Sequence, residues 1–470
     1  MVWLVCCIVA VMLIISCDCG KKKSYPIQAK SERGIITDRN GIVLVTNDSV
    51  MLSDSAGTVI ARSYPHPIAA QLIGHLGEAA QIDIDDDEDY SLGDIIGKTG
   101  VEKYYDKILR GERGVPGKNL KLTIDYELQK FGEELMEGLD GSIVAIEPST
   151  GEVLCMVSSP TYNPRLLSGD STSSNLLSLQ QDSLMPLYNR SVMGLYPPGG
   201  VFKAAQGLVF LQEDIISAQT RYPCERGFEN DELNIWCHGH SSPLTLAEAL
   251  GTDCNGYFCH GHLDMMDNGK YEMVQKALEK WRDYIVSLGF GYKLGIDLPN
   301  EKRGLIPNAS FYDKACKGQW SGSTIINNAL GQGEVLATPL QLANLSATIA
   351  NRGYYRIPHV VKEIQGGTID AKYAVVKYTK VSRNAYEAII NGMQLSATRG
   401  TCRALSKLPI ESCGVSGTAT LKGNDHSVFI GFAPIHNPRI AVAVYVVNGV
   451  REAKYAAPIG GLVMEKFLKK

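Results

Sequence analysis

Residues 195 to 212, LYPPGGVFKAAQGLVFLQ, combine a break in the chain with the start of a helix. The prolines and glycines at positions 197–200 end any preceding element, and the apolar residues after them recur at helical spacing. Lys203 falls in the first turn of this predicted helix. The helix dipole disfavours a cation there, and burial of a charge beside an apolar face is costly. A lysine at such a position indicates a specific partner.

Length and composition place the chain among globular proteins. Its 470 residues are enough for one large domain and a smaller one, and 20% charged with 44% hydrophobic residues is ordinary for such a protein. The net charge of −4, with no basic aromatic patch, argues against a nucleic-acid partner. No cofactor is expected from any motif.

The first twenty residues differ from the rest. An uncharged apolar run at 2–16 is followed by Cys17 and by three lysines at 21–23. The run is short for a membrane span, and a small residue before a cysteine is typical of a lipoprotein signal. We expect residues 1–20 to be a membrane anchor or a lipoprotein signal and the remainder to be exported; the type of anchor stays open.

Twelve cysteines form no simple framework. One group offers enough soft ligands for zinc: Cys224, Cys237, His240 and Cys254, with further histidines nearby. The alternatives are a Cys224–Cys237 disulfide or free buried thiols. Because the spacing matches no standard zinc finger, the sequence favours a disulfide or free thiols over a metal.

The pattern of elements predicts an α+β fold. GSIVAIEPSTGEVLCMVSS at 141–159 alternates around a turn, which indicates a hairpin. Further strands are expected near the C-terminus, in GVSGTAT, HSVFIGFAP and RIAVAVYVV, before a final helix. Strands from both ends enclose a helical middle, so we expect one antiparallel sheet flanked by helices.

Several separated motifs resemble class B penicillin-binding proteins of the elongation type. They include SERGIITDRNGIVLVTN at 31–47, GKTGVEKYYDKILRG at 97–111, LGFGYKLGIDLPNE at 288–301 and GQGEVLATPLQLANLSATIANRG at 331–353. The resemblance implies a five-stranded antiparallel sheet between helical layers at 120–470. It also implies a small N-terminal pedestal of the dimerisation type at 24–118. Only about twenty residues separate Gly41 from Arg62, so this pedestal is shortened.

The family crosslinks peptidoglycan through three motifs, and all three have changed here. Where the family reads Pro-Gly-Ser-Thr-Phe-Lys, this chain has Gly200 in place of the nucleophilic serine and keeps Lys203. In the second motif, Asp253 occupies the position of the family's relay serine, and Asn255 is retained. In the third motif, Val415 occupies the position of the family's lysine, and Ser416, Gly417 and Thr418 are retained.

These changes predict a pseudoenzyme. No Ser-x-x-Lys occurs anywhere in the chain. GKTG at 97–100 and SSN at 173–175 look like the third and second motifs, but each lies in another segment of the family pattern.

The resemblance, with these motifs lost, implies a scaffold, regulator or binder of the peptidoglycan stem peptide. Its partners would be the cell-wall machinery, and its place would be the periplasmic face of the bacterial inner membrane. The alternative is an active D,D-transpeptidase with an unrecognised nucleophile. We also expect Lys203 to form an ion pair with Asp253, because the family's lysine and relay serine serve one proton path and Asp253 stands at the position of that serine.

Overall fold

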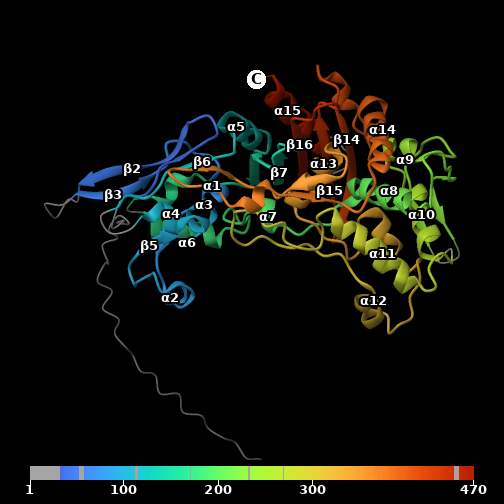
Figure 1. The fold of residues 1–470 in the computed structure, drawn as a ribbon, viewed down its shortest axis with the longest axis horizontal. Helices are drawn as coiled ribbons and strands as arrows, with labels where there is room; N and C mark the ends of the chain where they lie inside the picture. Colours follow the sequence, from blue (N-terminus) through green and yellow to red (C-terminus); the bar gives the residue numbers. More distant parts are fainter. Residues whose placement is uncertain are drawn as a thin grey trace, which may run out of the picture.

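A five-stranded antiparallel sheet lies at the centre of the larger part of the molecule (Figure 1). The computed structural model describes residues 32–51, 58–111, 115–169, 171–230, 233–267, 269–448 and 455–469. In order across the sheet, the strands are β14 (Cys413–Leu421), β15 (Asn424–Ala433), β16 (Ile440–Val447), β7 (Asp140–Ile146) and β8 (Val153–Ser159). The hairpin predicted at 141–159 is the β7–β8 pair, and the predicted C-terminal strands are β14 to β16.

Helices cover both faces of this sheet. Along β16, Ala441, Ala443 and Tyr445 pack into one core cluster, whereas the alternate residues pack into another. The first cluster includes α13 (Pro339–Ala350), and the second includes α5 (Tyr126–Leu135) and α15 (Ala456–Leu468). The predicted α+β architecture, with an antiparallel sheet between helical layers, is confirmed.

The stretch around Gly200 packs against the edge strand of the sheet. A 3₁₀ turn, η2 (Gly199–Phe202), leads directly into α8 (Lys203–Gln212). Gly199 has φ +60°, and a Cβ atom there would lie 2.5 Å from the backbone oxygen of Thr418 in β14. A Cβ on Gly417 would lie 2.4 Å from Cα of Gly200. The structure confirms that Gly200 lies at the N-terminal end of a helical segment, in the 3₁₀ turn that precedes α8, and that Val415 lies on the neighbouring edge strand.

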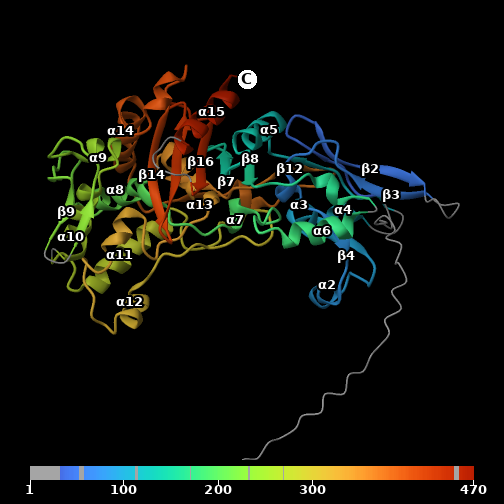
Figure 2. The same cartoon turned by 180° about the vertical axis from the view of Figure 1, so that it is seen from behind.

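The N-terminal part contains a second sheet. It is a mixed sheet, in the order β12 (Val361–Ile364), β6 (Leu120–Leu122), β1 (Ile36–Thr37), β2 (Val43–Met51) and β3 (Thr58–Ser63). Strand β12 belongs to the C-terminal half of the chain, so the two parts share this sheet. Figures 1 and 2 show it at the end of the molecule opposite α9 (Leu246–Gly251) and α10 (Asn255–Asp267). The domain boundary expected at 118–120 stays a prediction.

The remaining elements are short segments around these two sheets. In the N-terminal part they are α1 (Ala70–Ile73), β4 (Leu76–Glu78), α2 (Gln81–Asp86), β5 (Ile95–Gly97), α3 (Gly100–Tyr104) and α4 (Asp106–Arg110). Between and beyond the two sheets they are α6 (Thr172–Gln181), α7 (Arg190–Met193), β9 (Gly227–Glu229), β10 (Asn234–Trp236), α9 (Leu246–Gly251), α10 (Asn255–Asp267), α11 (Val274–Ser287), α12 (Ala309–Ala315), β11 (Tyr354–Arg356), β13 (Val376–Tyr378) and α14 (Arg383–Arg399). The remaining 3₁₀ turns are η1 (Pro164–Leu167), η3 (Ile326–Leu330), η4 (Ala371–Ala374) and η5 (Arg403–Lys407).

The predicted N-terminal anchor, residues 1–20, lies outside the described residues. Within the described part of the chain, no helix combines the length and the apolar character needed to cross a bilayer.

Candidate functional site

Lys203 is buried at the start of α8 and is fully engaged by one loop. Its Nζ donates to Oδ1 of Asp253 at 2.6 Å, to the backbone oxygen of Asp253 at 2.8 Å and to Oδ1 of Asn255 at 2.7 Å. An ammonium group has three donor hydrogens, so these three acceptors use all of them. The predicted ion pair between Lys203 and Asp253 is confirmed. Because its charge and donors are already used, the amine is poorly placed to accept a proton from a hydroxyl.

The Asp253 carboxylate fills the space beside Gly200. A Cβ atom built on Gly200 would lie 2.4 Å from Oδ1 of Asp253 and 2.9 Å from its Cγ. No ordinary Cβ contact is so short, so a side chain at position 200 requires the carboxylate to move. The carboxylate is held by Lys203, and its residue has φ 53°, a conformation that few non-glycine residues adopt. The two changed motif positions therefore form one packed unit.

Asn255 links this unit to a neighbouring hairpin. Its side chain accepts from Lys203, and its Nδ2 donates to the backbone oxygen of Trp236 at 2.7 Å. The backbone amide of Asn255 donates to Sγ of Cys237 at 3.3 Å. The retained asparagine thus has a structural role, holding the α10 N-terminus against β10.

The retained residues of the third motif lie on β14. Val415 and Ser416 are each only 2% exposed, whereas Thr418 is exposed. The Ser416 Oγ is buried, and its polar neighbour is the Cys402 thiol, whose pKa burial raises against the opposing effect of this contact. Within the described part of the chain, no carboxylate, amine or imidazole accepts a hydrogen bond from Ser416, so no such base is in place to activate it as a nucleophile.

An open cavity of about 740 Å³ lies beside these residues. Its lining includes Asp253 and the 416–418 segment of β14 from the predicted site. It also includes residues that no sequence motif singled out: Arg399, Thr401, Arg403 and His238. Arg399 ends α14 and Arg403 begins η5. Gly200 and Lys203 do not line the cavity, because Asp253 and β14 cover them.

A cluster of three cysteines and one histidine adjoins the cavity. The ligand atoms of Cys224, Cys237, His240 and Cys254 all lie within 4.8 Å of one another. Cys224 precedes β9 and Cys237 follows β10, and the pairing of these two strands brings the two cysteines together. The hairpin pairing extends to the backbone amide of Cys237, which donates to the backbone oxygen of Arg226 at 2.8 Å. Four such ligands around one centre fit tetrahedral zinc, whose bonds to sulfur are about 2.3 Å. Every one of the described cysteines is a free thiol in the structure.

The surroundings of the cluster favour the thiolate form of Cys237. The Cys254 thiol, the Asn255 amide and His240 act against burial and lower the pKa of Cys237 to about 4. The same contact with Cys237, together with burial, raises the pKa of Cys254, and burial raises the pKa of Cys224. A low thiol pKa is typical of metal ligands and reactive cysteines. The grouping of all four candidate ligands favours a metal site over a single disulfide, which would leave the other two unexplained.

Ser191 and the two motif look-alikes lie outside the candidate site. Ser191, in α7, is fully buried, and its Oγ lies 2.9 Å from Oγ of Ser142 and 3.1 Å from the oxygen of Val157. The look-alike at 97–100 lies in β5 and α3, where Lys98 pairs with Asp83. The one at 173–175 lies in α6. Figure 1 places β5, α3 and α6 well away from α8.

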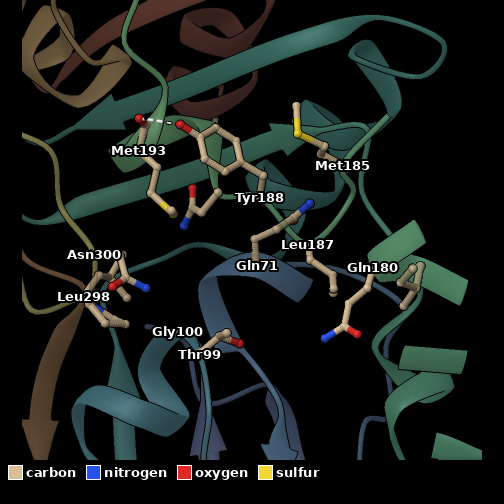
Figure 3. A pocket seen from close by; sticks show the side chains of 13 residues that line it. Gln71, Thr99, Gly100, Gln180, Met185, Leu187, Tyr188, Met193, Leu298 and Asn300 are labelled. Carbon is tan, nitrogen blue, oxygen red and sulfur yellow. Dashed lines mark hydrogen bonds between the residues drawn. The ribbon is translucent and has the colours of Figure 1, made fainter. Parts of the chain in front are cut away.

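A second cavity, of about 370 Å³, lies where the N-terminal part meets the larger part (Figure 3). Its lining comes from α1, α3, α6, α7, the segment at 185–189 and the 298–300 loop. Tyr188 in its wall donates to the backbone oxygen of Met193 at 2.6 Å. No carboxylate, amine, imidazole or thiol is among the lining residues. The titratable group in the lining is the Tyr188 phenol, whose hydroxyl is bonded to a backbone oxygen and whose pKa is raised by burial, so it is poorly suited to acid–base chemistry.

The comparison with protein families decides the identity of the fold. A model described as penicillin binding protein transpeptidase domain matches residues 141–465, and one described as penicillin-binding protein dimerisation domain matches residues 55–121. The chain belongs to the penicillin-binding protein transpeptidase family. The resemblance predicted from the sequence motifs is thus confirmed.

Relatives of this penicillin-binding protein include peptidoglycan D,D-transpeptidases named MrdA. The one from Acinetobacter baumannii is 30% identical, with 87% of this chain and 66% of that protein covered. The one from Escherichia coli is 27% identical, with 87% and 70% covered. The chain therefore spans about two thirds of the length of these curated relatives.

Solved structures agree with this assignment. Pseudomonas aeruginosa PBP2, solved in complex with WCK 5153, is 31% identical with a TM-score of 0.78, covering 94% of this chain and 97% of that one. Helicobacter pylori PBP2 has a TM-score of 0.79 at 24% identity, covering 95% and 99%, and shows the common fold.

Proposed function

We propose that this chain is a non-catalytic member of its family that acts in peptidoglycan synthesis by binding and not by acyl transfer. The observation that carries the proposal is the packed unit at the head of α8. Residue 200 has no side chain, and the Asp253 carboxylate fills the space beside it. The amine that would serve as base is hydrogen-bonded to three acceptors.

The size of the effect expected from loss of the nucleophile favours an inactive protein over a weakly active one. Removal of the nucleophile from a serine hydrolase lowers turnover on the order of a millionfold, or about 8 kcal/mol in barrier. The retained Asn255 and Thr418 provide no covalent centre. Cys254 is fully buried and belongs to the thiol cluster, which places it poorly for attack on a substrate carbonyl.

The alternative is an active D,D-transpeptidase with an unrecognised nucleophile. Its candidates in this region are Cys254 and Ser416. Neither has a base arranged as in a Ser-x-x-Lys pair, where nucleophile and base share one helical turn. We therefore rank it second.

Labelling with a fluorescent penicillin tests the proposal. The purified chain should give no covalent adduct, either by gel fluorescence or by intact mass, under conditions where an active member of the family is fully labelled. A stoichiometric acyl adduct on the folded chain would overturn the proposal. Peptide mapping of that adduct would then identify the nucleophile, with Cys254 and Ser416 as the first peptides to inspect.

The role that remains is that of a scaffold, regulator or peptide binder among cell-wall synthesis proteins. The family membership supports such a role, and so does the intact fold around the cavity beside Asp253 and β14. We place the protein at the periplasmic face of the inner membrane, tethered by its N-terminal residues. Fractionation of cells that express the full chain tests this location, and recovery in the soluble cytoplasmic fraction would contradict it.

A further inference from the structure

The cavity where the N-terminal part meets the larger part has the size and the position of a ligand site (Figure 3). Its volume of about 370 Å³ falls within the range of small-molecule sites, which occur preferentially at domain interfaces. The N-terminal part contributes Gln71, Thr99 and Gly100, and the larger part contributes the other lining residues. The lining shares no residue with the cavity beside Asp253 and β14, so the two cavities are separate.

Most polar side chains of this lining are already hydrogen-bonded within the chain. Nε2 of Gln71 donates to three backbone oxygens at 2.8 to 3.2 Å, and its Oε1 accepts from Thr161 at 3.1 Å. The Tyr188 hydroxyl donates to a backbone oxygen, and Oγ1 of Thr99 lies 3.0 Å from Nδ1 of His75. Because these groups already have partners, a polar ligand would gain few new hydrogen bonds from them.

The lining is also uncharged. Among the residues that the structure describes, no carboxylate, ammonium, guanidinium or imidazole lines this cavity. An ion placed there would lose hydration without gaining a counter-charge, which is costly. Apolar side chains form much of the wall, among them Leu179, Leu187, Met193 and Leu298. The lining therefore favours an occupant that is uncharged and mainly apolar.

Two residues of the lining have a backbone conformation that few non-glycine residues adopt. Met185 has φ 51° and Asn300 has φ 65°, and both residues are exposed. Such conformations cost free energy and cluster at sites that hold ligands. Their presence in two separate segments around one cavity is an independent observation in favour of a ligand.

We propose that this cavity binds an uncharged, mainly apolar small molecule that contacts both parts of the chain. Because such a ligand binds the folded chain alone and touches both parts, it stabilises their joined arrangement. The site shares no residue with the packed unit of Gly200, Lys203 and Asp253. It is therefore independent of whether the chain transfers acyl groups.

Two fluorescent probes test the class of ligand. N-phenyl-1-naphthylamine is neutral, and 8-anilino-1-naphthalenesulfonate has the same ring system with an added sulfonate. In fluorescence titrations of the full chain, the neutral amine should saturate one site with a dissociation constant on the order of 0.1 mM. It should bind at least about tenfold more tightly than the sulfonate, because the cavity offers no counter-charge.

Variants locate the bound probe. Leu187→Gln and Met193→Gln place an amide in the apolar wall and should each weaken binding of the neutral amine by about fivefold. Met185→Gln changes an exposed residue of the lining, so it tests the site even where the two half-buried variants fail to fold. Leu184→Gln is the matched control, because this exposed leucine lies in the same segment and does not line the cavity. It should leave the affinity unchanged.

Three results would overturn the inference: no saturable binding of the neutral amine up to about 1 mM, equally tight binding of the sulfonate, or lining variants that bind as well as Leu184→Gln. Titration with N-acetyl-leucyl-leucinamide covers the other kind of occupant, an apolar segment of a protein partner. Tighter binding of this neutral peptide than of the aromatic amine would assign the cavity to such a segment and contradict a small-molecule site. Weaker binding of the peptide supports the proposal.

Discussion

The carboxylate of Asp253 lies where the side chain of residue 200 would begin, with Oδ1 2.4 Å from the site of a Cβ atom on Gly200. Two departures from the family pattern, in different motifs, therefore occupy one volume. Lys203 holds the carboxylate there through a 2.6 Å ion pair. The loss of a nucleophile and the gain of an acid are coupled by packing, which makes restoration of either motif alone unfavourable.

Gly200→Ala should destabilise the fold by about 1 to 3 kcal/mol, the usual range for overpacking. Alanine normally stabilises a helical turn relative to glycine, so a loss would isolate the contact with Asp253. In the background Asp253→Gly the same substitution should be neutral or stabilising, since the carboxylate is gone and φ 53° suits glycine. Urea unfolding of the four proteins gives the coupling energy.

Gly239→Ala is the control for that cycle. A Cβ on Gly239 would meet no atom within 4 Å, so the free energy of unfolding should change by less than about 0.5 kcal/mol. Equal effects of Gly200→Ala with and without the carboxylate would show that Asp253 moves aside freely.

Gly200→Ser alone should not restore acylation by penicillin. The new serine side chain would clash with the Asp253 carboxylate at its Cβ atom. The Lys203 amine would remain hydrogen-bonded to its three acceptors. Labelling of the triple variant Gly200→Ser, Asp253→Ser, Val415→Lys provides the comparison, because it returns all three family residues. Clear labelling of the single variant would mean that the two other losses matter little.

The sequence predicted the sheet and the ion pair because both rest on local pattern. Strand β16 is a continuous apolar run, and the alternation of its side chains between two clusters follows from the strand period of two. Lys203 and Asp253 could be paired because each stands in a motif of known purpose. By contrast, β12 joins the N-terminal sheet through contacts with β6, more than 230 residues earlier in the chain. No local pattern encodes such a pairing.

The arginines and the thiol cluster show a second limit. Arg399 and Arg403 reach the cavity because α14 ends beside β14, and they belong to no motif. The four soft ligands were named from the sequence, yet their irregular spacing favoured a disulfide or free thiols. The spacing is irregular because a β-hairpin and the N-terminus of α10, and not a finger loop, bring the ligands together. The choice between zinc and a disulfide stays a prediction.

Lys203→Met should destabilise the chain by about 2 to 4 kcal/mol, because it leaves a carboxylate and a backbone oxygen of Asp253 without their donor. Adding Asp253→Gly should recover part of this loss. Lys407→Met, which removes an exposed cation, should change stability by less than about 0.5 kcal/mol. An effect of Lys203→Met as small as that of the control would indicate that the ion pair contributes little.

The chain purified under reducing conditions should contain about one zinc per molecule, and chelation should lower its melting temperature by several degrees. Cys224→Ser should abolish zinc binding, whereas Cys316→Ser should preserve it, because Cys316 lies outside the cluster. Elemental analysis and non-reducing mass spectrometry measure both outcomes. A zinc-free chain two mass units lighter than its reduced form would identify a disulfide instead.

Glu133 should make stability depend on pH near neutrality. This α5 carboxyl accepts from the backbone amide of Ala69 at 2.7 Å and from Gln129 at 2.8 Å, at the joint between the N-terminal part and the larger part. Burial raises its pKa to about 7, against the opposing effect of these two hydrogen bonds. The folded state therefore holds a proton that the unfolded chain releases near pH 4.5.

The sign follows from that difference. The contribution of the protonated Glu133 carboxyl to the free energy of unfolding is fully present below about pH 4.5. It is lost as the pH rises to about 7, which lowers the free energy of unfolding by about 1 to 3 kcal/mol. Glu133→Gln keeps an oxygen to accept from Ala69 and has no charge to expose. Its stability relative to the wild type should therefore increase between pH 5 and pH 8, as measured by urea unfolding at each pH. Glu134→Gln, an exposed neighbour whose carboxylate lies 4.0 Å from Lys130, should show no such increase. Parallel pH profiles for wild type and Glu133→Gln would show that Glu133 is ionised in the folded protein across this range.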